Sequence, residues 1–352
     1  MMTPLTKLSV LCVLSTACVA QNAPKATFSI ISDPISNTWS NFALSGDGKV
    51  MAANYGGEIF RWTAEQGFQD LGPGDPYSSS IGISRDGSTI ISGHIGSDGY
   101  AAPAIWNAGG IVDLGHPSNG CTTIGNSWGS GYGLNAKGTI AVGLAWTCTD
   151  AEGFLWTAKD GNRSLGHPPG GASSRASAIS ANGRTTVGFW EMSVGPRRPV
   201  RWMGARRDLF LGENTIGEAD AVTSDGERIA GQTLDANGNG VAFVYSDQNG
   251  LLLLGTVSHG PTDQSFPNGI ADNGVVVGWS GDPFGSGIKA FYWRESTGMR
   301  SLGAVLRYLG ANVPAGTTLT TALSISADGS TIVGEYVDSQ FNFGNWMVHF
   351  TR

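Results

Sequence analysis

The sequence predicts an all-β fold, a seven-bladed β-propeller whose blades are four-stranded antiparallel sheets. One short phrase recurs seven times: a hydrophobic stretch, an Asp-Gly-like turn, and a second hydrophobic stretch that usually ends in Val-Gly. The turns are about 39 to 55 residues apart, a spacing typical of strand-rich propellers. The 352 residues include 53 Gly and 11 Trp, and only 14% are charged, which fits short strands and tight turns. The seven turns fall at Asp47-Gly48, Asp86-Gly87, Lys137-Gly138, Asn182-Gly183, Asp225-Gly226, Asn273-Gly274 and Asp328-Gly329.

Each repeat is interpreted as four strands. In the second repeat these are residues 81–84, 89–93, 104–106 and 110–115, and Asp86-Gly87 forms the first hairpin because Gly accepts a positive φ. The third strand recurs as an aromatic-rich segment ending in Trp or Tyr, and the fourth ends in Leu-Gly. Because these aromatic residues recur in register, packing between blades explains them most simply.

The seventh repeat is incomplete, and the start of the chain supplies what it lacks. After its third strand, around Trp346 to Phe350, the chain stops without a Leu-Gly strand. A lone strand, residues 26–31, precedes the first repeat. Pairing this strand with the last blade closes the ring and hides the sheet edges that an open array would expose.

The repeat resembles the bacterial extracellular HAF-type repeat. The pattern is Ile-Ser-x-Asp-Gly-x-x-x-Val-Gly, then an aromatic-x-Trp strand and Leu-Gly, and it is clearest at residues 325–334 and 83–87. The resemblance covers residues 40–350. Individual repeats depart from it at Ala52-Ala53, Lys137 and Tyr245. It implies an extracellular propeller and brings no catalytic motif.

A secretory signal is predicted over residues 1–20. Lys7 precedes an apolar run from Leu8 to Val19 that is too short to span a bilayer, and cleavage is expected after Ala20. A buried first strand is the alternative, and a lipoprotein anchor at Cys18 is another. We therefore expect residues 21–352 to form a single propeller domain, secreted or periplasmic, without a transmembrane segment.

Charge and cysteine content limit the class of partner and the redox setting. The net charge is −7 and no basic stripe is present, so nucleic acid is not expected as a partner. After signal cleavage only Cys121 and Cys148 remain, and in an exported chain these predict one disulfide, with two free thiols as the alternative. In the chain-entropy model its ring of about 28 residues would contribute about 3 kcal/mol.

The two faces of the predicted disc differ in their connections. First-to-second and third-to-fourth connections are tight and lie on what we call the short-turn face. Second-to-third and between-blade connections lie on the opposite, long-loop face; they include residues 115–131, 255–268 and 303–320. Variable loops on a rigid scaffold usually carry binding or catalysis, although long loops are also tolerated as plain insertions.

Aromatic residues that follow the second strands are the predicted ligand contacts. They can stack on sugar rings or anchor a protein partner, and packing beneath the loops is the alternative. These residues are Tyr55, Trp146, Trp190, Trp279 and Tyr336.

Two histidines are the candidate general acids or bases of an enzyme. His94 and His259 do not recur between repeats and map to the long-loop face, where either would act with a loop carboxylate or with Arg197 or Arg198. His116 and His167 share a repeat position, which favours a structural role.

One loop resembles a calcium-binding sequence. Asp235, Asn237 and Asn239 provide oxygen ligands at alternate positions, but the acidic residue expected at the twelfth position is replaced by Ser246. An Asn/Gly-rich loop without metal is the alternative. Calcium is the one cofactor that the sequence suggests.

The leading hypothesis is a non-catalytic recognition module that binds an extracellular glycan or a surface protein through the long-loop face. The alternative is an extracellular polysaccharide-degrading enzyme, a lyase or hydrolase, with its site at the same face. A purely structural or assembly role is the third hypothesis. The sequence does not identify the ligand.

Overall fold

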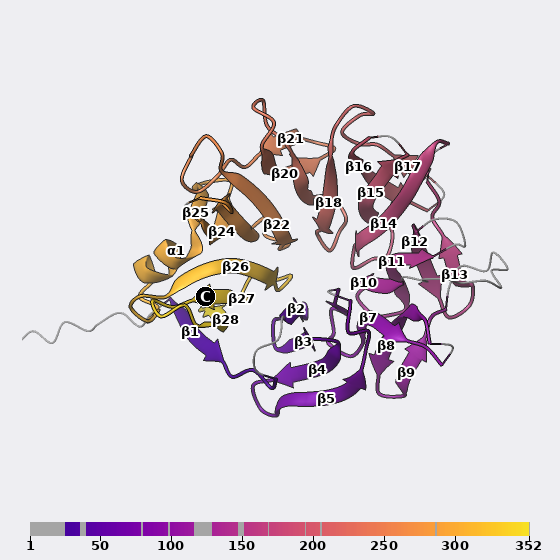
Figure 1. Ribbon diagram of the computed structural model, residues 1–352, viewed down its shortest axis with the longest axis horizontal. Helices are drawn as coiled ribbons and strands as arrows, with labels where there is room; N and C mark the ends of the chain where they lie inside the picture. The colour runs from indigo at the N-terminus through magenta and orange to yellow at the C-terminus, as the bar shows by residue number, and fades with distance from the viewer. Residues whose placement is uncertain are drawn as a thin grey trace, which may run out of the picture.

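The computed structural model describes residues 25–351, apart from 36–39, 79, 98, 116–128, 147–150, 168, 194, 205 and 286. Seven four-stranded antiparallel sheets surround a central axis, so the predicted seven-bladed propeller is confirmed (Figure 1). The predicted signal at residues 1–20, Cys18, Cys121 and Cys148 lie outside the described residues.

Blades one to three are built in chain order from the channel outward. The strands of blade one are β2 (Ser40–Leu44), β3 (Val50–Tyr55), β4 (Glu58–Thr63) and β5 (Gly67–Pro73). Those of blade two are β6 (Gly82–Ile83), β7 (Ile90–Ile95), β8 (Ala101–Asn107) and β9 (Gly110–Asp113). Those of blade three are β10 (Ser130–Leu134), β11 (Ile140–Trp146), β12 (Ala151–Thr157) and β13 (Gly161–Ser164).

Blades four to six repeat this order. The strands of blade four are β14 (Gly171–Ile179), β15 (Thr186–Met192), β16 (Arg197–Met203) and β17 (Arg206–Asp208). Those of blade five are β18 (Gly217–Val222), β19 (Ile229–Leu234), β20 (Gly240–Ser246) and β21 (Gly250–Leu253). Those of blade six are β22 (Gln264–Ile270), β23 (Val276–Asp282), β24 (Gly287–Arg294) and β25 (Gly298–Ser301).

Blade seven joins the two ends of the described chain. Its inner strands are β26 (Thr318–Ile325), β27 (Thr331–Val337) and β28 (Phe343–Phe350), and its outer strand is β1 (Ala26–Ile31). Strand β1 runs antiparallel to β28, with Ala26 opposite Phe350 and Ile31 opposite Asn345. The ring closure expected for residues 26–31 is therefore confirmed.

The recurring Ser-x-Asp-Gly phrase has a hydrogen-bonding explanation. In the first repeat the Ser45 hydroxyl donates to Asp47 Oδ1 at 2.9 Å, and the backbone N–H of Lys49 donates to the same oxygen at 3.1 Å. The N–H of Val50 donates to the Ser45 hydroxyl at 3.0 Å, and Gly48 takes a φ of 68°. Ser and Asp thus satisfy the backbone of a tight turn that only Gly completes without strain.

One short helix replaces part of a connection that the sequence analysis treated as a loop. Helix α1 (Leu302–Tyr308) lies between β25 and β26 on the rim of the disc (Figure 1). Leu302 and Leu306, one turn apart, are both buried in the core of blades six and seven, and this packing stabilises so short a helix. Across the described part of the chain, no helix has the length and apolar character needed to cross a membrane.

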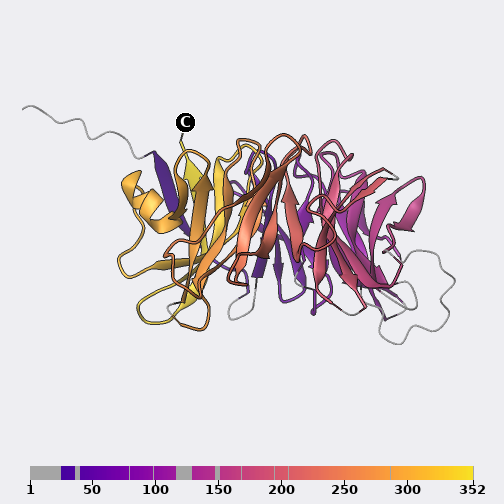
Figure 2. The ribbon, with the colours of Figure 1, turned by 90° about the horizontal axis from the view of Figure 1, so that it is seen from above.

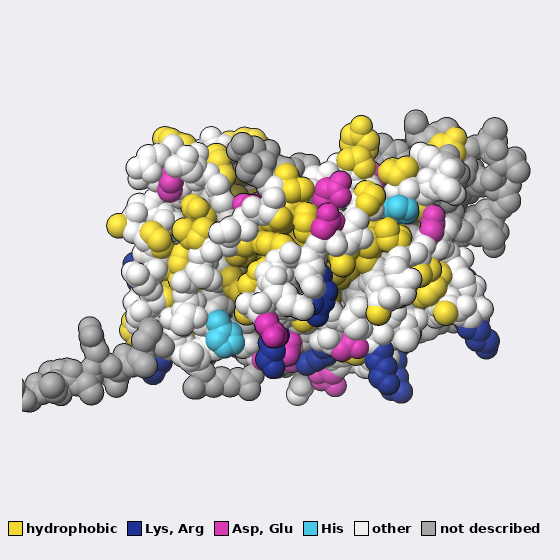
Figure 3. Space-filling view, turned by 90° about the horizontal axis from the view of Figure 1, so that it is seen from below, with side chains coloured by type: hydrophobic (Ala, Val, Ile, Leu, Met, Phe, Trp, Pro, Cys, Tyr) yellow, Lys and Arg dark blue, Asp and Glu magenta, His cyan; other side chains and the backbone are white. Residues whose placement is uncertain are grey.

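Viewed edge-on, the strands run from one face of the disc to the other (Figure 2). Successive connections therefore alternate between the two faces, so first-to-second and third-to-fourth connections share one face and the remaining connections share the other, as the sequence analysis expected. In Figure 3, which looks at the rim, Lys and Arg side chains gather mainly along the lower edge, hydrophobic side chains reach the surface above it, and acidic side chains occur at both levels.

Candidate functional site: the central channel

The innermost strands of the seven blades enclose a channel of about 340 Å³. Its wall is formed by side chains and backbone from β2, β6, β10, β14, β18, β22 and β26 and by the segment before β6. A space of this size lies at the lower end of the range for small-molecule sites.

A β-bulge occurs in the inner strand of five consecutive blades. Near the end of each of these strands the pairing register skips one residue, so that residue does not pair with the second strand. Strands β14 and β26 each have a second irregularity nearer their start, at Ala172 and Thr320. A bulge redirects the side chain of its extra residue, and bulges are frequent next to functional sites. The five residues skipped near the strand ends all line the channel, and we call them the bulge ring. They are Tyr132, Ser177, Asp220, Asn268 and Leu323.

The sequence analysis missed this ring, although a signal for it was present. Each bulge residue lies five positions before the turn residue of its repeat, as Asp220 lies before Asp225 and Asn268 before Asn273. At that position the side chain changes from repeat to repeat among aromatic, hydroxyl, acidic, amide and aliphatic types. A position that varies in chemistry inside a regular repeat indicates a site.

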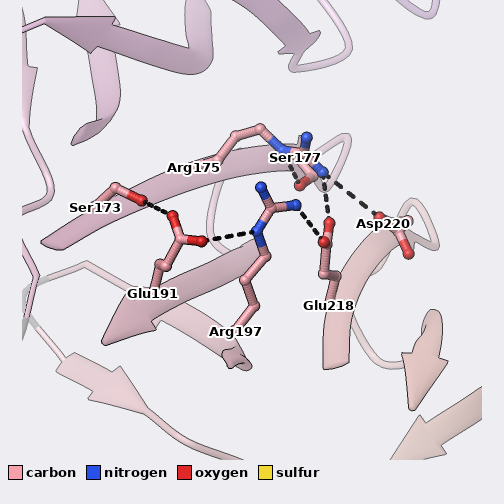
Figure 4. Close-up of polar contacts among 7 residues, drawn as sticks. All are labelled: Ser173, Arg175, Ser177, Glu191, Arg197, Glu218 and Asp220. Atoms are coloured by element: carbon pink, nitrogen blue, oxygen red, sulfur yellow. Dashed lines mark hydrogen bonds and ion pairs between the residues drawn. The ribbon is translucent and has the colours of Figure 1, made fainter. Parts of the chain in front are cut away.

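A cluster of charged side chains lies next to Ser177 and Asp220 of the bulge ring, on strands of blades four and five (Figure 4). Arg175 in β14 forms an ion pair with Glu218 in β18 at 2.9 Å and lies 3.8 Å from Asp220. Arg197, at the start of β16, pairs with the other oxygen of Glu218 at 2.5 Å and with Glu191 at 3.6 Å. The cluster therefore bridges blades four and five.

Two further contacts hold the arginines in place. The guanidinium carbons of Arg175 and Arg197 lie 4.8 Å and 4.2 Å from the ring centre of Phe189, and Arg175 also lies 5.1 Å from that of Tyr132. Cation–π contacts of this kind favour a partly desolvated guanidinium. The Nε of Arg175 donates to the Ser177 hydroxyl at 3.1 Å, which ties the cluster to the bulge ring.

The cluster carries one more negative than positive charge. Two arginines face three carboxylates, those of Glu191, Glu218 and Asp220. Protein surrounds the Asp220 carboxyl, and this removal from bulk water raises its pKa to about 7; the positive charge of Arg175 lowers the pKa, and the negative charge of Glu218 raises it. About a quarter of the side chain still faces the channel. The positive charges around Asp220 therefore offset only part of the free-energy cost of ionising it.

Two of the predicted contact aromatics lie in the core of their blades. The Tyr55 side chain is 1% exposed, its hydroxyl donates to Asp33 Oδ1 at 2.7 Å, and its ring meets Phe42, Phe60 and Phe68 edge-on. Burial in this apolar surrounding, with Asp33 adjacent, raises the pKa of Tyr55. Trp190 is 7% exposed and packs edge-on against Trp202. Neither offers an open ring face to a ligand.

The other three predicted aromatics are half-buried and belong to different blades. Trp279 stacks on Phe266 with ring centres 4.6 Å apart, Tyr336 packs against the core of blades six and seven, and Trp146 ends β11 in blade three. Because these three residues lie in separate blades, no single blade presents all of them to a ligand.

The candidate catalytic histidines lie apart from the charged cluster. In blade two, Nδ1 of His94 is 3.2 Å from the Pro73 carbonyl oxygen, and its ring meets Trp106 edge-on. His259 is exposed after blade five, with a φ of 57°. Of the four residues singled out by number for that chemistry, His94, His259, Arg197 and Arg198, only Arg197 belongs to the charged cluster. His167, expected to be structural, lies 3.4 Å from Glu152.

The calcium-like loop is a hydrogen-bonded turn in the structure. Asp235 Oδ1 accepts hydrogen bonds from the N–H groups of Asn237 and Asn239, at 2.8 and 2.9 Å. Hydrogen bonds from the Asn239 backbone and its neighbours lower the pKa of Asp235. Within the described ranges, no group of three or more His, Cys, Asp or Glu residues is arranged to hold a metal ion. Calcium binding by this loop stays a prediction.

The same turn recurs in blade seven with a different residue at its strained position. Asp338 Oδ1 accepts from the N–H groups of Gln340 and Asn342, as Asp235 does in blade five. The fourth residue has a positive φ in both: 84° at Gly238 and 62° at Phe341. Phe341 is 81% exposed, so neither its backbone nor its packing favours phenylalanine there.

Two more phenylalanines stand out from the same face. Phe284, in the second-to-third connection of blade six, is 95% exposed, and Phe343, just after the blade-seven turn, is 80% exposed. Large apolar side chains this exposed on neighbouring loops indicate an interaction surface. We call Phe284, Phe341 and Phe343 the phenylalanine tips.

Two surface grooves lie elsewhere on the disc. One, between blades five and six, includes Arg228 and Trp293; the other, of about 920 Å³, lies beside α1 and includes Arg300 and Tyr308. Both reach the short-turn face, and neither contains residues of the channel or the phenylalanine tips.

No protein-family model matches the sequence, and no curated protein matches it. Several solved structures are similar in shape. The β-propeller domain of the Trilobed protease from Pyrococcus furiosus, described as having an open velcro topology, is 9% identical; the match covers 92% of this chain and 95% of that chain, with a TM-score of 0.57.

A chain of the mitotic checkpoint complex is 14% identical over 100% of both chains, with a TM-score of 0.51. A putative TolB from Agrobacterium tumefaciens is 13% identical, with 66% of this chain and 88% of that chain covered and a TM-score of 0.45. At identities of 9% and 14%, the likeness to the Trilobed protease domain and to the mitotic checkpoint complex chain shows the propeller fold alone.

Proposed function

We propose that the protein is a secreted, non-catalytic recognition module that binds a surface protein through its long-loop face. The observation that carries this proposal is the exposure of the phenylalanine tips, which is 80% or more at each. Secretion rests on the predicted signal at residues 1–20.

A protein partner explains the phenylalanine tips better than a glycan does. Aromatic side chains that enter pockets of a partner are common centres of protein interfaces. Sugar stacking instead requires a flat aromatic platform, and two of the predicted platform residues, Tyr55 and Trp190, are buried. A glycan ligand is the competing hypothesis, with the half-buried Trp279, which stacks on Phe266, as its candidate contact.

The strained backbone at Phe341 supports a functional role for this side chain. A non-glycine residue with positive φ costs of the order of 1 kcal/mol or more, and such strain often persists at binding sites. The equivalent blade-five position holds Gly238, which adopts the same conformation without that cost. Binding through the exposed ring accounts for retaining phenylalanine.

An extracellular polysaccharide-degrading enzyme is the second candidate, and one observation favours it. Asp220 has a pKa near neutrality, as a general acid can, and lies 3.8 Å from Arg175. Turnover of an extracellular polysaccharide by the wild type, lost in Asp220→Asn, would support the enzyme and displace the recognition module.

The proposal is tested by proximity cross-linking on cells that produce the protein, followed by affinity measurement with the recovered partner. The variant carries Phe284→Ser, Phe341→Ser and Phe343→Ser; the matched control carries Leu251→Ser, Leu252→Ser and Tyr308→Ser at exposed positions of the rim. We expect the control to bind like the wild type and the tip variant to bind at least about 100-fold more weakly.

A glycan array probed with the same proteins separates the two kinds of ligand. Selective glycan binding that survives the tip substitutions and is lost in Trp279→Ala would overturn the protein-partner proposal. Equal partner binding by the tip variant and the wild type would do the same.

A further inference from the structure

We propose that the central channel is a binding site for a small organic cation, a protonated amine or guanidinium with a short hydrocarbon portion, and that Asp220 is its counter-ion. The proposal concerns the channel and does not depend on the phenylalanine tips or on the proposed function.

The bulge in β18 determines where the Asp220 side chain points. The pairing of β18 with β19 skips from Ala219 to Ala221, so Asp220 is the extra residue and lines the channel. Its nearest cation is Arg175, at 3.8 Å, beyond the range of a good charge-assisted hydrogen bond. Glu218 lies closer to that guanidinium, at 2.9 Å. Among the residues that the structure describes, the Asp220 carboxylate therefore lacks a close partner of its own.

The charged groups around Asp220 leave one negative charge uncompensated. Arg175 from β14 and Arg197 from β16 are shared among Glu218 on β18, Glu191 on β15 and Asp220 itself. The flanking strands β19 and β22 contain no ionisable residue, since they read IAGQTL and QSFPNGI. A bound cation would complete the charge balance, whereas an anion would meet a net negative cluster.

The ring around the channel has a polar half and an apolar half. Tyr132, Ser177, Asp220 and Asn268 follow one another in blades three to six. Leu323, Phe42 and Ile81 occupy the same repeat position in blades seven, one and two. Hydroxyl and amide oxygens can accept hydrogen bonds from an ammonium group while the apolar residues pack against a hydrocarbon chain. A channel divided in this way favours a ligand that combines a cationic group with a short hydrocarbon portion.

The Asn268 side chain, in the polar half of the channel wall, is held in place by a hydrogen bond. Its Nδ2 donates to the backbone carbonyl of Ala322 in blade seven at 2.8 Å, which fixes the amide between two blades. The carboxamide oxygen is then an acceptor on the channel wall. With Asp220 from the neighbouring blade, it provides two acceptors for one cationic head group.

The test uses three probes of similar size and different charge: n-butylammonium, n-butanol and butyrate. Their affinities for the mature wild-type protein are measured by isothermal titration calorimetry and by saturation-transfer NMR. We expect n-butylammonium to bind at least 10-fold more tightly than the other two. Equal binding of n-butanol would overturn the role of charge.

Matched variants locate the site. Asp220→Asn removes the carboxylate with little change in shape and is expected to weaken n-butylammonium binding at least 10-fold. Glu227→Gln removes one negative charge from an exposed turn of the same blade and is expected to leave binding unchanged. Thermal unfolding of both variants shows whether they are folded. A folded Asp220→Asn protein that binds like the wild type would refute the assignment.

The pH dependence and a calcium titration complete the test. Because the site needs ionised Asp220, affinity for n-butylammonium is expected to rise at least 10-fold between pH 5.5 and pH 8.5. A flat profile would contradict Asp220 as the counter-ion. Binding of Ca²⁺ in the channel, without binding of n-butylammonium, would show that the site is for a metal instead.

Discussion

The hydroxyl of Tyr55 donates a 2.7 Å hydrogen bond to Oδ1 of Asp33, and this contact joins blade one to the segment that follows the closing strand. The side-chain amide of Asn345, in blade seven, donates to the same oxygen at 2.8 Å. Asp33 thus links the first and last blades where the ring closes. A residue expected to contact a ligand instead stabilises the closure.

Removing the Tyr55 hydroxyl tests this structural role. Tyr55→Phe keeps the ring packed and deletes a partly buried hydrogen bond to a carboxylate, which costs about 1.5–3 kcal/mol. We expect the free energy of unfolding in urea to fall by that amount, with partner binding unchanged. Tyr77→Phe, at an exposed position, is the control and is expected to have no effect. Weakened partner binding at unchanged stability would return Tyr55 to the binding surface.

Removing the closing strand tests how much the ring depends on it. In β1, Ala26 and Ile31 are buried, and Phe28 stacks on Trp346 with ring centres 6.5 Å apart. A chain that starts at residue 32 loses these contacts and exposes the edge of β28. We expect a loss of at least about 3 kcal/mol in stability, together with self-association. Thermal unfolding and size-exclusion chromatography measure both effects; an unchanged unfolding temperature and elution volume would show that the ring does not depend on this strand.

The fold was predictable because its determinants are local and repeated. Each Ser-x-Asp-Gly turn satisfies its own backbone, as Ser45 and Asp47 show, so seven copies reveal seven hairpins without tertiary information. The closing strand followed from counting strands. Helix α1 was missed because the buried face of Leu302 and Leu306 depends on the neighbouring blades, which are distant in sequence.

The channel site was less predictable because it depends on a departure from regular pairing. The sequence analysis did not single out Asp220, which lies within β18 and not in a loop. Alternation along a strand assigns each side chain to a face, and one extra residue changes that assignment. The burial of Trp190 is likewise a tertiary effect, since its position after the second strand fits either a surface or a core.

Replacing Phe341 by glycine is expected to stabilise the protein. The substitution relieves the strain of a φ of 62° and reproduces Gly238 in the equivalent turn of blade five. We expect a gain of about 1 kcal/mol in the free energy of unfolding, together with weaker partner binding because the exposed ring is lost. Gly238→Ala, which introduces the strain, is expected to destabilise by a similar amount. A destabilised Phe341→Gly protein would show that the ring packs against the fold.

The pKa of Asp220 predicts how stability changes with pH. The carboxyl titrates near 7 in the folded protein, against an ordinary value of 3.8, so between these values the folded state binds more protons than the unfolded state. Stability is therefore fully present below about pH 4 and falls as the pH rises toward 7. At about 1.4 kcal/mol per pKa unit, the loss has an upper limit of about 4 kcal/mol.

Asp220→Asn removes this titration and is expected to change the pH profile in one direction. The variant cannot ionise at this position, so its stability relative to the wild type should increase from pH 4 to pH 8 by about 2–4 kcal/mol. Urea unfolding at pH 4, 5.5, 7 and 8.5 measures the difference, and Glu227→Gln controls for loss of a charge elsewhere. A difference that stays constant with pH would mean that Asp220 is ionised throughout, with Arg175 as a sufficient partner at 3.8 Å.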